Sequence, residues 1–300
     1  MVMPLDLSDE VEKIRNDRHR GARELTISAL RSLRILVEQF NAGMGEDLID
    51  YMLSSAKAFA QARPSMVSIL NSIAAVVYDV LKQGCHGGRV KESILSSIDE
   101  QLDRFEKAFR NVISFASKLP TGGSTVSTCS YSSTVIQALI EARKGGKSFR
   151  VIALRSRSTS EPIEYGSLMC RALNEADVQT QLVDEKEVGD IDEFIDMAIV
   201  GADTIFPDGS FLNGYPTLLL AKEMSKRRKP FYVVSETWKI DPLSMLGYRP
   251  AVELGMDKVP ADLVTAFMTE LGSVESKGVS VHAQKLLMRL RTISNRWTVV

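Results

Sequence analysis

Residues 119–154 read LPTGGSTVSTCSYSSTVIQALIEARKGGKSFRVIAL, and the pattern of apolar residues along the chain changes here. After a break at 120–123 come a short β-branched run at 125–129, a helical stretch at 135–144 and a second apolar run at 150–154. Short buried strands that alternate with helices are typical of βαβ units and a parallel sheet. The stretch therefore predicts the first βαβ unit of a doubly wound α/β domain.

The same alternation continues towards the C-terminus. Further strands are expected at 178–183, 197–200 and 230–234, with a helix at 165–176. Leucines and an isoleucine at helical spacing predict a last helix over 280–296, with basic residues on its other side. This helix either packs on the chain or a partner subunit, or it contacts a partner or RNA.

The residues before the break predict helices throughout. Apolar residues three to four apart over 25–40 indicate an amphipathic helix, with Gly43 as a left-handed cap. Further helices are expected at 46–61, from Pro64 to about 82, and at 90–118; Pro64 suits a first turn, where its missing N–H has no partner. We expect a helical domain over 1–120, an α/β domain over 121–278 and an extra basic amphipathic helix in 279–300.

The composition excludes several classes of protein. A length of 300 residues suits about two domains of roughly 100–200 residues. The 37 basic and 38 acidic residues give no support to nucleic-acid binding through bulk charge. Three cysteines and three histidines without ligand spacing predict no metal site and a reducing, cytoplasmic setting. We expect no membrane span, because no apolar run is long enough.

In open parallel sheets the ligand binds beyond the carboxyl ends of the strands. After the first strand, Ser132, Ser133 and Thr134 open a helix. Free N–H groups and hydroxyls at a helix start bind phosphate well, but Ser and Thr are also ordinary N-caps, and both readings stay open. The dinucleotide and P-loop glycine patterns are absent, which disfavours those two kinds of site.

Four other places carry candidate polar groups. Asp203, just past the fourth strand, suits acid–base work or a simple turn. Lys239, after the fifth strand, suits a phosphate or an acidic neighbour, although solvated lysines are commoner. In the helical region, the guanidinium groups of Arg20 and Arg63 suit phosphate oxygens, although either residue alone is more often a surface arginine.

The order of several segments resembles one known family. The segments are RGA at 20–22, RPS at 63–65, GADTI at 201–205, Asn213 with Thr217, KPFYVVSETWK at 229–239 and VPADLVTAFMTELG at 259–272. The chain is similar to the family that contains the alpha, beta and delta subunits of eukaryotic translation initiation factor 2B. That family also holds isomerases of ribose-1,5-bisphosphate and of methylthioribose-1-phosphate. The resemblance covers residues 20–272 and implies a helical domain followed by a Rossmann-like domain.

The resemblance also implies a pair of catalytic residues for the isomerase members. A cysteine after the first strand and an aspartate after the fourth move a proton between adjacent carbons of the opened sugar. Asp203 matches the aspartate, and ungapped alignment puts Ser130 at the cysteine position. A one-residue shift would put Cys129 there, but it needs a deletion in the following helix. A serine hydroxyl is a far poorer acid or base than a thiol.

Two more segments depart from the isomerases. Their E-x-R-P segment reads RSRS at 155–158, where a basic residue, Arg155, replaces the acidic one. Their N-K-x-G-T segment reads NGYPT at 213–217 and loses its lysine. The initiation-factor subunits also lack the cysteine, and Tyr131-Ser132-Ser133 resembles their version of the loop.

Three hypotheses follow from these departures. The first is an initiation factor 2B-like subunit that binds a phosphorylated small ligand without turnover and acts through protein contacts. The second is an aldose–ketose isomerase of a sugar phosphate, in which Asp203 moves the proton and Ser130 or Cys129 is the acid. The third is a relative with a changed substrate, another phosphorylated metabolite or a nucleotide. The ligand-binding candidates in all three are Arg20, Gly21, Ala22, Arg63, Ser132, Ser133, Thr134, Arg157, Asn213 and Lys239.

The resemblance also carries expectations about partners. We expect a homo-oligomer, a dimer or larger, because the resembled family assembles through its sheet domains. Subunits of translation initiation factor 2 are candidate partners of the first hypothesis. No cofactor is expected.

Overall fold

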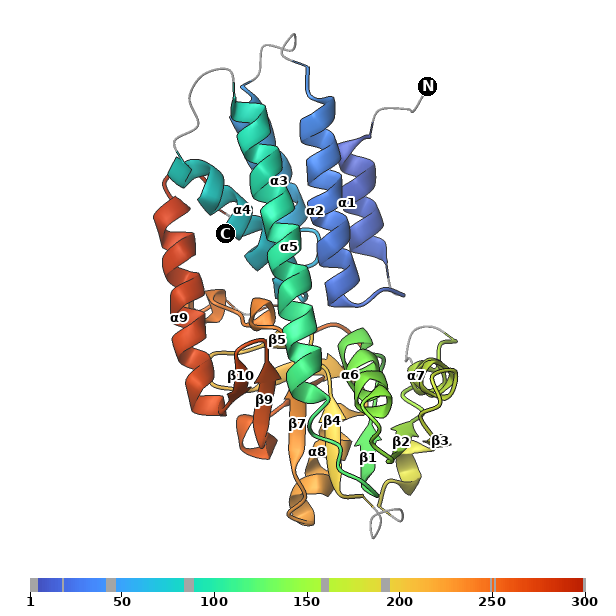
Figure 1. Ribbon diagram of the computed structural model, residues 1–300. Helices are drawn as coiled ribbons and strands as arrows, with labels where there is room; N and C mark the ends of the chain where they lie inside the picture. The colour runs from blue at the N-terminus through green and yellow to red at the C-terminus, as the bar shows by residue number, and fades with distance from the viewer. Residues whose placement is uncertain are drawn as a thin grey trace.

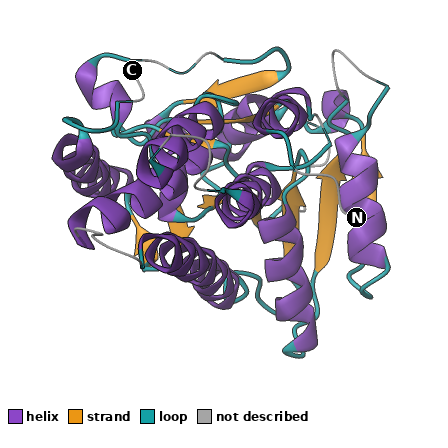
Figure 2. Ribbon diagram, turned by 90° about the horizontal axis from the view of Figure 1, so that it is seen from above, coloured by secondary structure: helices purple, strands orange, loops and turns teal. Residues whose placement is uncertain are grey.

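A computed structural model describes residues 5–17, 19–41, 47–83, 89–157, 162–189, 195–248, 250 and 252–298. Figure 1 shows two layers, with the N-terminal helices above and a sheet flanked by helices below. The helices are α1 (Leu7–Asn16), α2 (Ala22–Gln39), α3 (Leu48–Ala60), α4 (Val67–Gln83), α5 (Val90–Ala116), α6 (Ser133–Lys144), α7 (Tyr165–Asn174), α8 (Thr217–Lys226) and α9 (Ser276–Ile293). Seen from above, the helices overlie the strands (Figure 2).

The helical layer is built around α4. Every residue from Val67 to Val77 of this helix is buried, because α2, α3, α5 and α9 all contact it. The leucine face of α2 also points into this core, with Leu25, Leu30 and Leu33 fully buried. The predicted helices therefore form, with ends that differ by a few residues, and α1 is added before them.

Pro64 does not lie in the first turn of α4, as its sequence context predicts. The helix begins at Val67, and residues 63–66 form a separate turn closed by the N–H of Met66 on the carbonyl of Arg63. Contacts with the α/β layer hold this turn, since the Thr204 hydroxyl donates to the Ser65 carbonyl at 2.8 Å. Residue Gly43 and the stretch at 84–88 lie outside the described residues.

The central sheet has seven strands in the order β10-β9-β7-β4-β1-β2-β3. All neighbours are parallel except β10 and β9. The strands are β1 (Thr125–Thr128), β2 (Arg150–Leu154), β3 (Thr180–Val183), β4 (Met197–Val200), β7 (Phe231–Val234), β9 (Ala266–Thr269) and β10 (Gly272–Val274). The predicted doubly wound α/β fold is confirmed, and the strand order reverses between β1 and β4.

A second, three-stranded sheet was not predicted. It has the order β5-β6-β8 and is antiparallel, from β5 (Thr204–Ile205), β6 (Phe211–Gly214) and β8 (Met256–Val259). These strands are too short for a two-residue alternation to stand out. The pairing of β6 with β8 joins segments about forty residues apart in the chain, and local sequence does not reveal it.

Two long helices tie the layers together. The first half of α5 packs in the helical core through Ile94 and Ile98, and its second half packs against the sheet through Val112 and Ala116. Helix α9 starts at Ser276, four residues before the predicted start, and runs back up to the helical layer (Figure 1). The division into domains at residues 120 and 278 stays a prediction.

Within the described part of the chain, no helix combines the length and the apolar character that crossing a bilayer requires.

Candidate functional site

A cavity of about 680 Å³ lies between the two layers, at the carboxyl ends of the parallel strands. We call it the strand-end cavity. Ser130 and Tyr131 follow β1, Arg157 follows β2 and Asp203 follows β4 in its wall. The upper wall comes from the α1–α2 and α3–α4 connections. The cavity therefore sits where the strand order reverses, the place at which doubly wound folds bind ligands.

The structure brings most of the predicted residues to this region. Arg20, Gly21, Arg63, Ser130, Arg157 and Asp203 line the strand-end cavity. A smaller hollow of about 30 Å³ shares Gly21 and Asp203 with it and is also lined by Ala22, Ser132, Ser133, Thr134, Asn213 and Lys239. Cys129 lines neither space.

Among the acidic residues of the wall, Asp203 has the carboxyl group with the fewest hydrogen bonds. Its N–H donates to the Leu212 carbonyl at 2.9 Å, but no described side chain hydrogen-bonds its carboxyl group. Burial raises the pKa of Asp203, Lys239 and Arg63 oppose this rise, and Glu253 adds to it. A carboxyl group with a raised pKa holds its proton closer to neutral pH, which suits proton transfer.

Ser130 adopts a backbone conformation that is rare for residues with side chains. Its φ is 62°, and that of Ser156 in the neighbouring strand-end loop is 52°. The two loops are joined, because the Ser130 N–H donates to Oγ of Ser156 at 2.7 Å and that hydroxyl donates to the Leu154 carbonyl at 3.0 Å. This bond fixes the loop after β1, and Ser130 lies in the cavity wall.

Cys129 lies in the apolar core below the cavity. Its side chain is 1% exposed and belongs to a cluster with Leu154, Val200 and Phe211. Sγ lies 3.3 Å from Oγ1 of Thr217. Burial raises the pKa of the thiol to about 12, so a thiolate is scarce at neutral pH.

The start of α6 shows the capping arrangement. Oγ of Ser132 accepts from the N–H of Val135 at 3.4 Å. The hydroxyl also lies close to Gly201, where a β-carbon would approach it to 2.6 Å. The N–H groups of Ser133 and Thr134 are not used by this cap. The capping interpretation thus describes Ser132, while an anion site at the next two residues stays a prediction.

Arginines of the upper wall are held by carboxylates. Nη2 of Arg63 lies 3.0 Å from Oε2 of Glu253, and Nη1 donates to the Asp17 carbonyl. Nε of Arg20 donates to Oδ2 of Asp17 at 2.7 Å, and Nη1 donates to Ser28 at 2.7 Å. Arg63 is 6% exposed and Arg20 is 40% exposed on the side chain, so Arg20 is the more accessible of the two.

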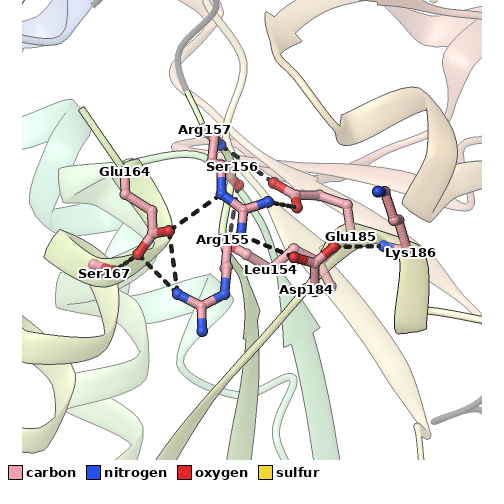
Figure 3. A network of polar contacts seen from close by, with 9 residues as sticks. All are labelled: Leu154, Arg155, Ser156, Arg157, Glu164, Ser167, Asp184, Glu185 and Lys186. Carbon is pink, nitrogen blue, oxygen red and sulfur yellow. Dashed lines mark hydrogen bonds and ion pairs between the residues drawn. The ribbon is translucent and has the colours of Figure 1, made fainter. Parts of the chain in front are cut away.

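Arg157 lies at the centre of the polar network drawn in Figure 3. Its guanidinium is 2.8 Å from Asp184, 3.4 Å from Glu185 and 3.5 Å from Glu164. Arg155 pairs with the same Glu164 at 3.1 Å. These carboxylates raise the pKa of Arg157, led by the hydrogen bond to Asp184. The network fixes a positive group in the wall after β2.

Lys239 and Asn213 are buried behind the cavity. Nζ of Lys239 donates to the Ala202 carbonyl at 2.8 Å and lies 3.9 Å from Oε2 of Glu236. Nδ2 of Asn213 donates to Oγ1 of Thr217 at 2.9 Å. Lys239 is 5% exposed and Asn213 is 5% exposed, so both reach a ligand only through the small hollow. No group of three or more potential metal ligands occurs in the described ranges.

Sequence reasoning missed three kinds of wall residue. Glu253 holds Arg63, Asp17 holds Arg20, and Tyr215 lines the wall beside Gly214. Glu253 and Asp17 belong to no motif of recognisable spacing, and Tyr215 stands in the NGYPT segment without being singled out there. Only the tertiary contact of Glu253 with Arg63, 190 positions apart in the chain, identifies it.

Known proteins resemble the chain along most of its length. Residues 18–255 match the sequence profile of the Initiation factor 2 subunit family. The chain belongs to this family. The match covers well over half of the chain and confirms the family predicted from the order of motifs.

Relatives in this family carry two kinds of name. The ribose 1,5-bisphosphate isomerase of Archaeoglobus fulgidus is 27% identical over 290 residues, which are 90% of either chain. A putative translation initiation factor eIF-2B subunit 2-like protein of Pyrococcus furiosus is 26% identical over 286 residues, 91% of this chain and 98% of the relative. Sequence identity therefore does not separate the two names.

Solved structures show the same fold. Translation initiation factor eIF-2B from Pyrococcus horikoshii superposes with a TM-score of 0.77 at 26% identity, over 91% of this chain and 98% of that one. The 5-methylthioribose 1-phosphate isomerase from the same organism has a TM-score of 0.71 at 19% identity, over 94% and 88%. At that lower identity the likeness concerns the fold alone.

Proposed function

We propose that the protein is an initiation factor 2B-like subunit that binds a phosphorylated small ligand in the strand-end cavity and does not isomerise it. The observation that carries this proposal is the position of Cys129. Its thiol is buried in the apolar core, and Ser130 takes the place in the cavity wall. Cys170, the other described cysteine, does not line this cavity either. Among the described residues, no thiol therefore lines the cavity together with Asp203.

The charges of the wall support a phosphorylated ligand. Arg20, Arg63 and Arg157 line the cavity from three different loops. Guanidinium groups bind phosphate oxygens through paired N–H donors. Asp17, Asp203 and Glu253 in the same wall suit the hydroxyls of a sugar, which donate to carboxylates. A sugar phosphate is the ligand class that uses both kinds of group.

Phosphorus NMR of the purified protein tests both parts of the proposal. Ribose-1,5-bisphosphate and methylthioribose-1-phosphate are each added in excess. We expect their phosphorus lines to broaden without conversion. Arg20→Gln is expected to remove the broadening, and Arg110→Gln, at an exposed arginine outside the cavity, should leave it unchanged. Conversion of either compound at an ordinary enzymatic rate contradicts binding without turnover.

The isomerase alternative has its own supporting observation. The Asp203 carboxyl group is free of hydrogen bonds from described side chains, and burial raises its pKa, as a catalytic acid or base requires. The name of the Archaeoglobus relative favours the same reaction. If turnover is seen, Asp203→Asn should abolish it while the phosphorus lines still broaden. Full activity of that variant excludes Asp203 as the group that moves the proton.

A changed substrate remains the third hypothesis. Ser130 and Arg155 depart from the isomerase pattern, and a nucleotide offers the same phosphate chemistry. Broadening with adenosine monophosphate but with neither sugar phosphate would select it.

The proposal also covers the cellular compartment and the oligomeric state of the protein. We propose a cytoplasmic homo-oligomer with subunits of translation initiation factor 2 as partners. A tetrameric eIF2B-beta2-delta2 complex from C. thermophilum has the same fold, with a TM-score of 0.76. Light scattering is the test, and a mass of 33.2 kDa, that of one chain, contradicts the oligomer.

A further inference from the structure

Lys239 lies in a short turn, η4 (Thr237–Lys239), that follows β7. Its Nζ donates to the Ala202 carbonyl at 2.8 Å, directly before Asp203 in the chain. The ammonium group is also the nearby charge that most opposes the effect of burial on the pKa of Asp203. The position of this turn therefore determines where the positive charge beside Asp203 lies.

Hydrogen bonds within the turn are few. The N–H of Lys239 donates to the Glu236 carbonyl at 3.1 Å, and the N–H of Ile240 donates to the Thr237 carbonyl at 3.0 Å. Bonds of this 3-10 type have poorer geometry than those of an α-helix. The orientation of so short a turn depends on the elements that pack against it.

Asn71 of α4 is the residue that reaches the turn from the helical layer. It lies in the fully buried part of that helix and is 2% exposed. Its Nδ2 donates to the Trp238 carbonyl at 2.7 Å and to the Ile240 carbonyl at 2.8 Å. These two carbonyls flank Lys239 in the chain, so one amide group uses both of its N–H donors to hold the backbone on either side of the lysine.

Two other contacts hold the beginning of the turn. The N–H of Thr237 donates to Oε2 of Glu270 at 3.0 Å, and its hydroxyl donates to Oε1 of the same residue. The Arg289 guanidinium of α9 lies 5.8 Å from the centre of the Trp238 ring. These contacts act before Lys239, whereas the bonds from Asn71 enclose it.

We propose that Asn71 is a positioning residue, which holds the turn so that the ammonium group of Lys239 stays on the Ala202 carbonyl beside Asp203. The inference rests on the proposed function in one respect, since Lys239 is there a candidate for ligand binding. Leucine has nearly the size of asparagine but no donor, and it suits a buried helix. Asn71→Leu therefore separates filling the core from holding the turn.

Fluorescence tests the position of the turn without any ligand. The chain has two tryptophans, so Trp297→Phe leaves Trp238, in the turn itself, as the only one. In this background Asn71→Leu should raise the acrylamide quenching constant of Trp238 and shift its emission to longer wavelength. Ile73→Val is the matched control for lost packing, because Ile73 is fully buried about half a turn round the same helix, and it should change neither quantity. Unchanged Trp238 fluorescence in Asn71→Leu overturns the inference.

A second measurement tests whether Asn71 acts through Lys239. Phosphorus NMR titration with ribose-1,5-bisphosphate compares the natural protein, Asn71→Leu, Lys239→Met and the double variant. Each single variant should bind about tenfold more weakly, and the double variant should bind no more weakly than Lys239→Met. Ile73→Val should bind as the natural protein does. Additive losses in the double variant would show that Asn71 acts by another route and would refute the inference.

The two measurements separate this inference from the proposed function. If the natural protein does not bind the bisphosphate, the proposed function fails, and the fluorescence of Trp238 alone decides whether Asn71 holds the turn. If Asn71→Leu does not fold, Asn71→Ala removes the same donors without adding bulk and replaces it in both measurements.

Discussion

The hydroxyl oxygen of Ser130 lies 2.6 Å from the point where a β-carbon on Gly214 would stand. Both residues line the strand-end cavity, and both mark departures from the isomerase pattern, where the resemblance implies a cysteine and a lysine. The two departures therefore lie next to each other in space. Ser130 occupies space that any side chain at position 214 would need.

This contact predicts coupling between the two positions. Gly214→Ala should destabilise the protein by about 1 kcal/mol, because the new methyl group collides with Ser130. In a Ser130→Gly background, which also suits the φ of 62°, that cost should largely disappear. Urea denaturation of the natural protein, the two single variants and the double variant measures the free energy of unfolding of each. Gly122→Ala is the control, since nothing lies within 4 Å of its β-carbon. Additive effects in the double variant would show that the residues do not touch.

Cys129 should be inert in the folded protein. Its thiol is buried and its pKa is raised to about 12, so iodoacetamide finds almost no thiolate at pH 8. Mass spectrometry of peptides should show Cys129 unmodified in buffer and modified in urea. Cys170, which is partly exposed, is the internal reference and should react sooner. Rapid modification of Cys129 in buffer would argue for a thiol that reaches the cavity and would favour the isomerase.

Asp203 should make stability depend on pH in a defined direction. Its pKa is raised in the folded state, so the folded protein holds more protons than the unfolded chain, and stability falls as pH rises above the ordinary range of aspartate. Asp203→Asn should therefore raise the melting temperature at pH 7 by ~2–4 °C. The difference should vanish near pH 3, where both states are protonated. A variant that is less stable than the natural protein at pH 7 contradicts the raised pKa.

Arg157 should contribute to ligand binding, and Arg155 should not. Both arginines pair with Glu164, but only Arg157 lines the cavity. Arg157→Gln should weaken ribose-1,5-bisphosphate binding about tenfold, because a charge-assisted hydrogen bond is lost. Arg155→Gln is the matched control from the same network. Equal losses in the two variants would mean that the network acts by holding the loop rather than by contacting the ligand.

Trp297 should anchor the C-terminal segment on the helical layer. It is 4% exposed, and its Nε1 donates to the Leu53 carbonyl at 3.0 Å. Trp297→Ala should cost about 3–5 kcal/mol in the free energy of unfolding. Trp297→Phe separates the hydrogen bond from the packing and should cost clearly less. A small effect of the alanine variant would make the last turn dispensable.

The sequence by itself determined most of the helices, five strands of the central sheet and the edge of that sheet that carries the site. The strands at 150–154 and 197–200 coincide with β2 and β4, because buried runs of β-branched and aliphatic residues carry a local signal. Asp203 and Ser130 were found the same way, as residues that follow strands. The carboxyl ends of parallel strands lie at the same edge of a sheet, so residues that follow these strands come close together.

Only the tertiary structure decided which polar groups remain available in the walls. Whether Cys129 or Ser130 faces the cavity depends on the left-handed turn at Ser130 and on its bond to Ser156, which lies in another loop. Arg63 is held by Glu253 through a contact between distant segments of the chain. Periodicity within one segment reports burial of a face, but pairing across segments depends on how the faces meet in space. That physical difference separates what could be predicted from what had to be seen.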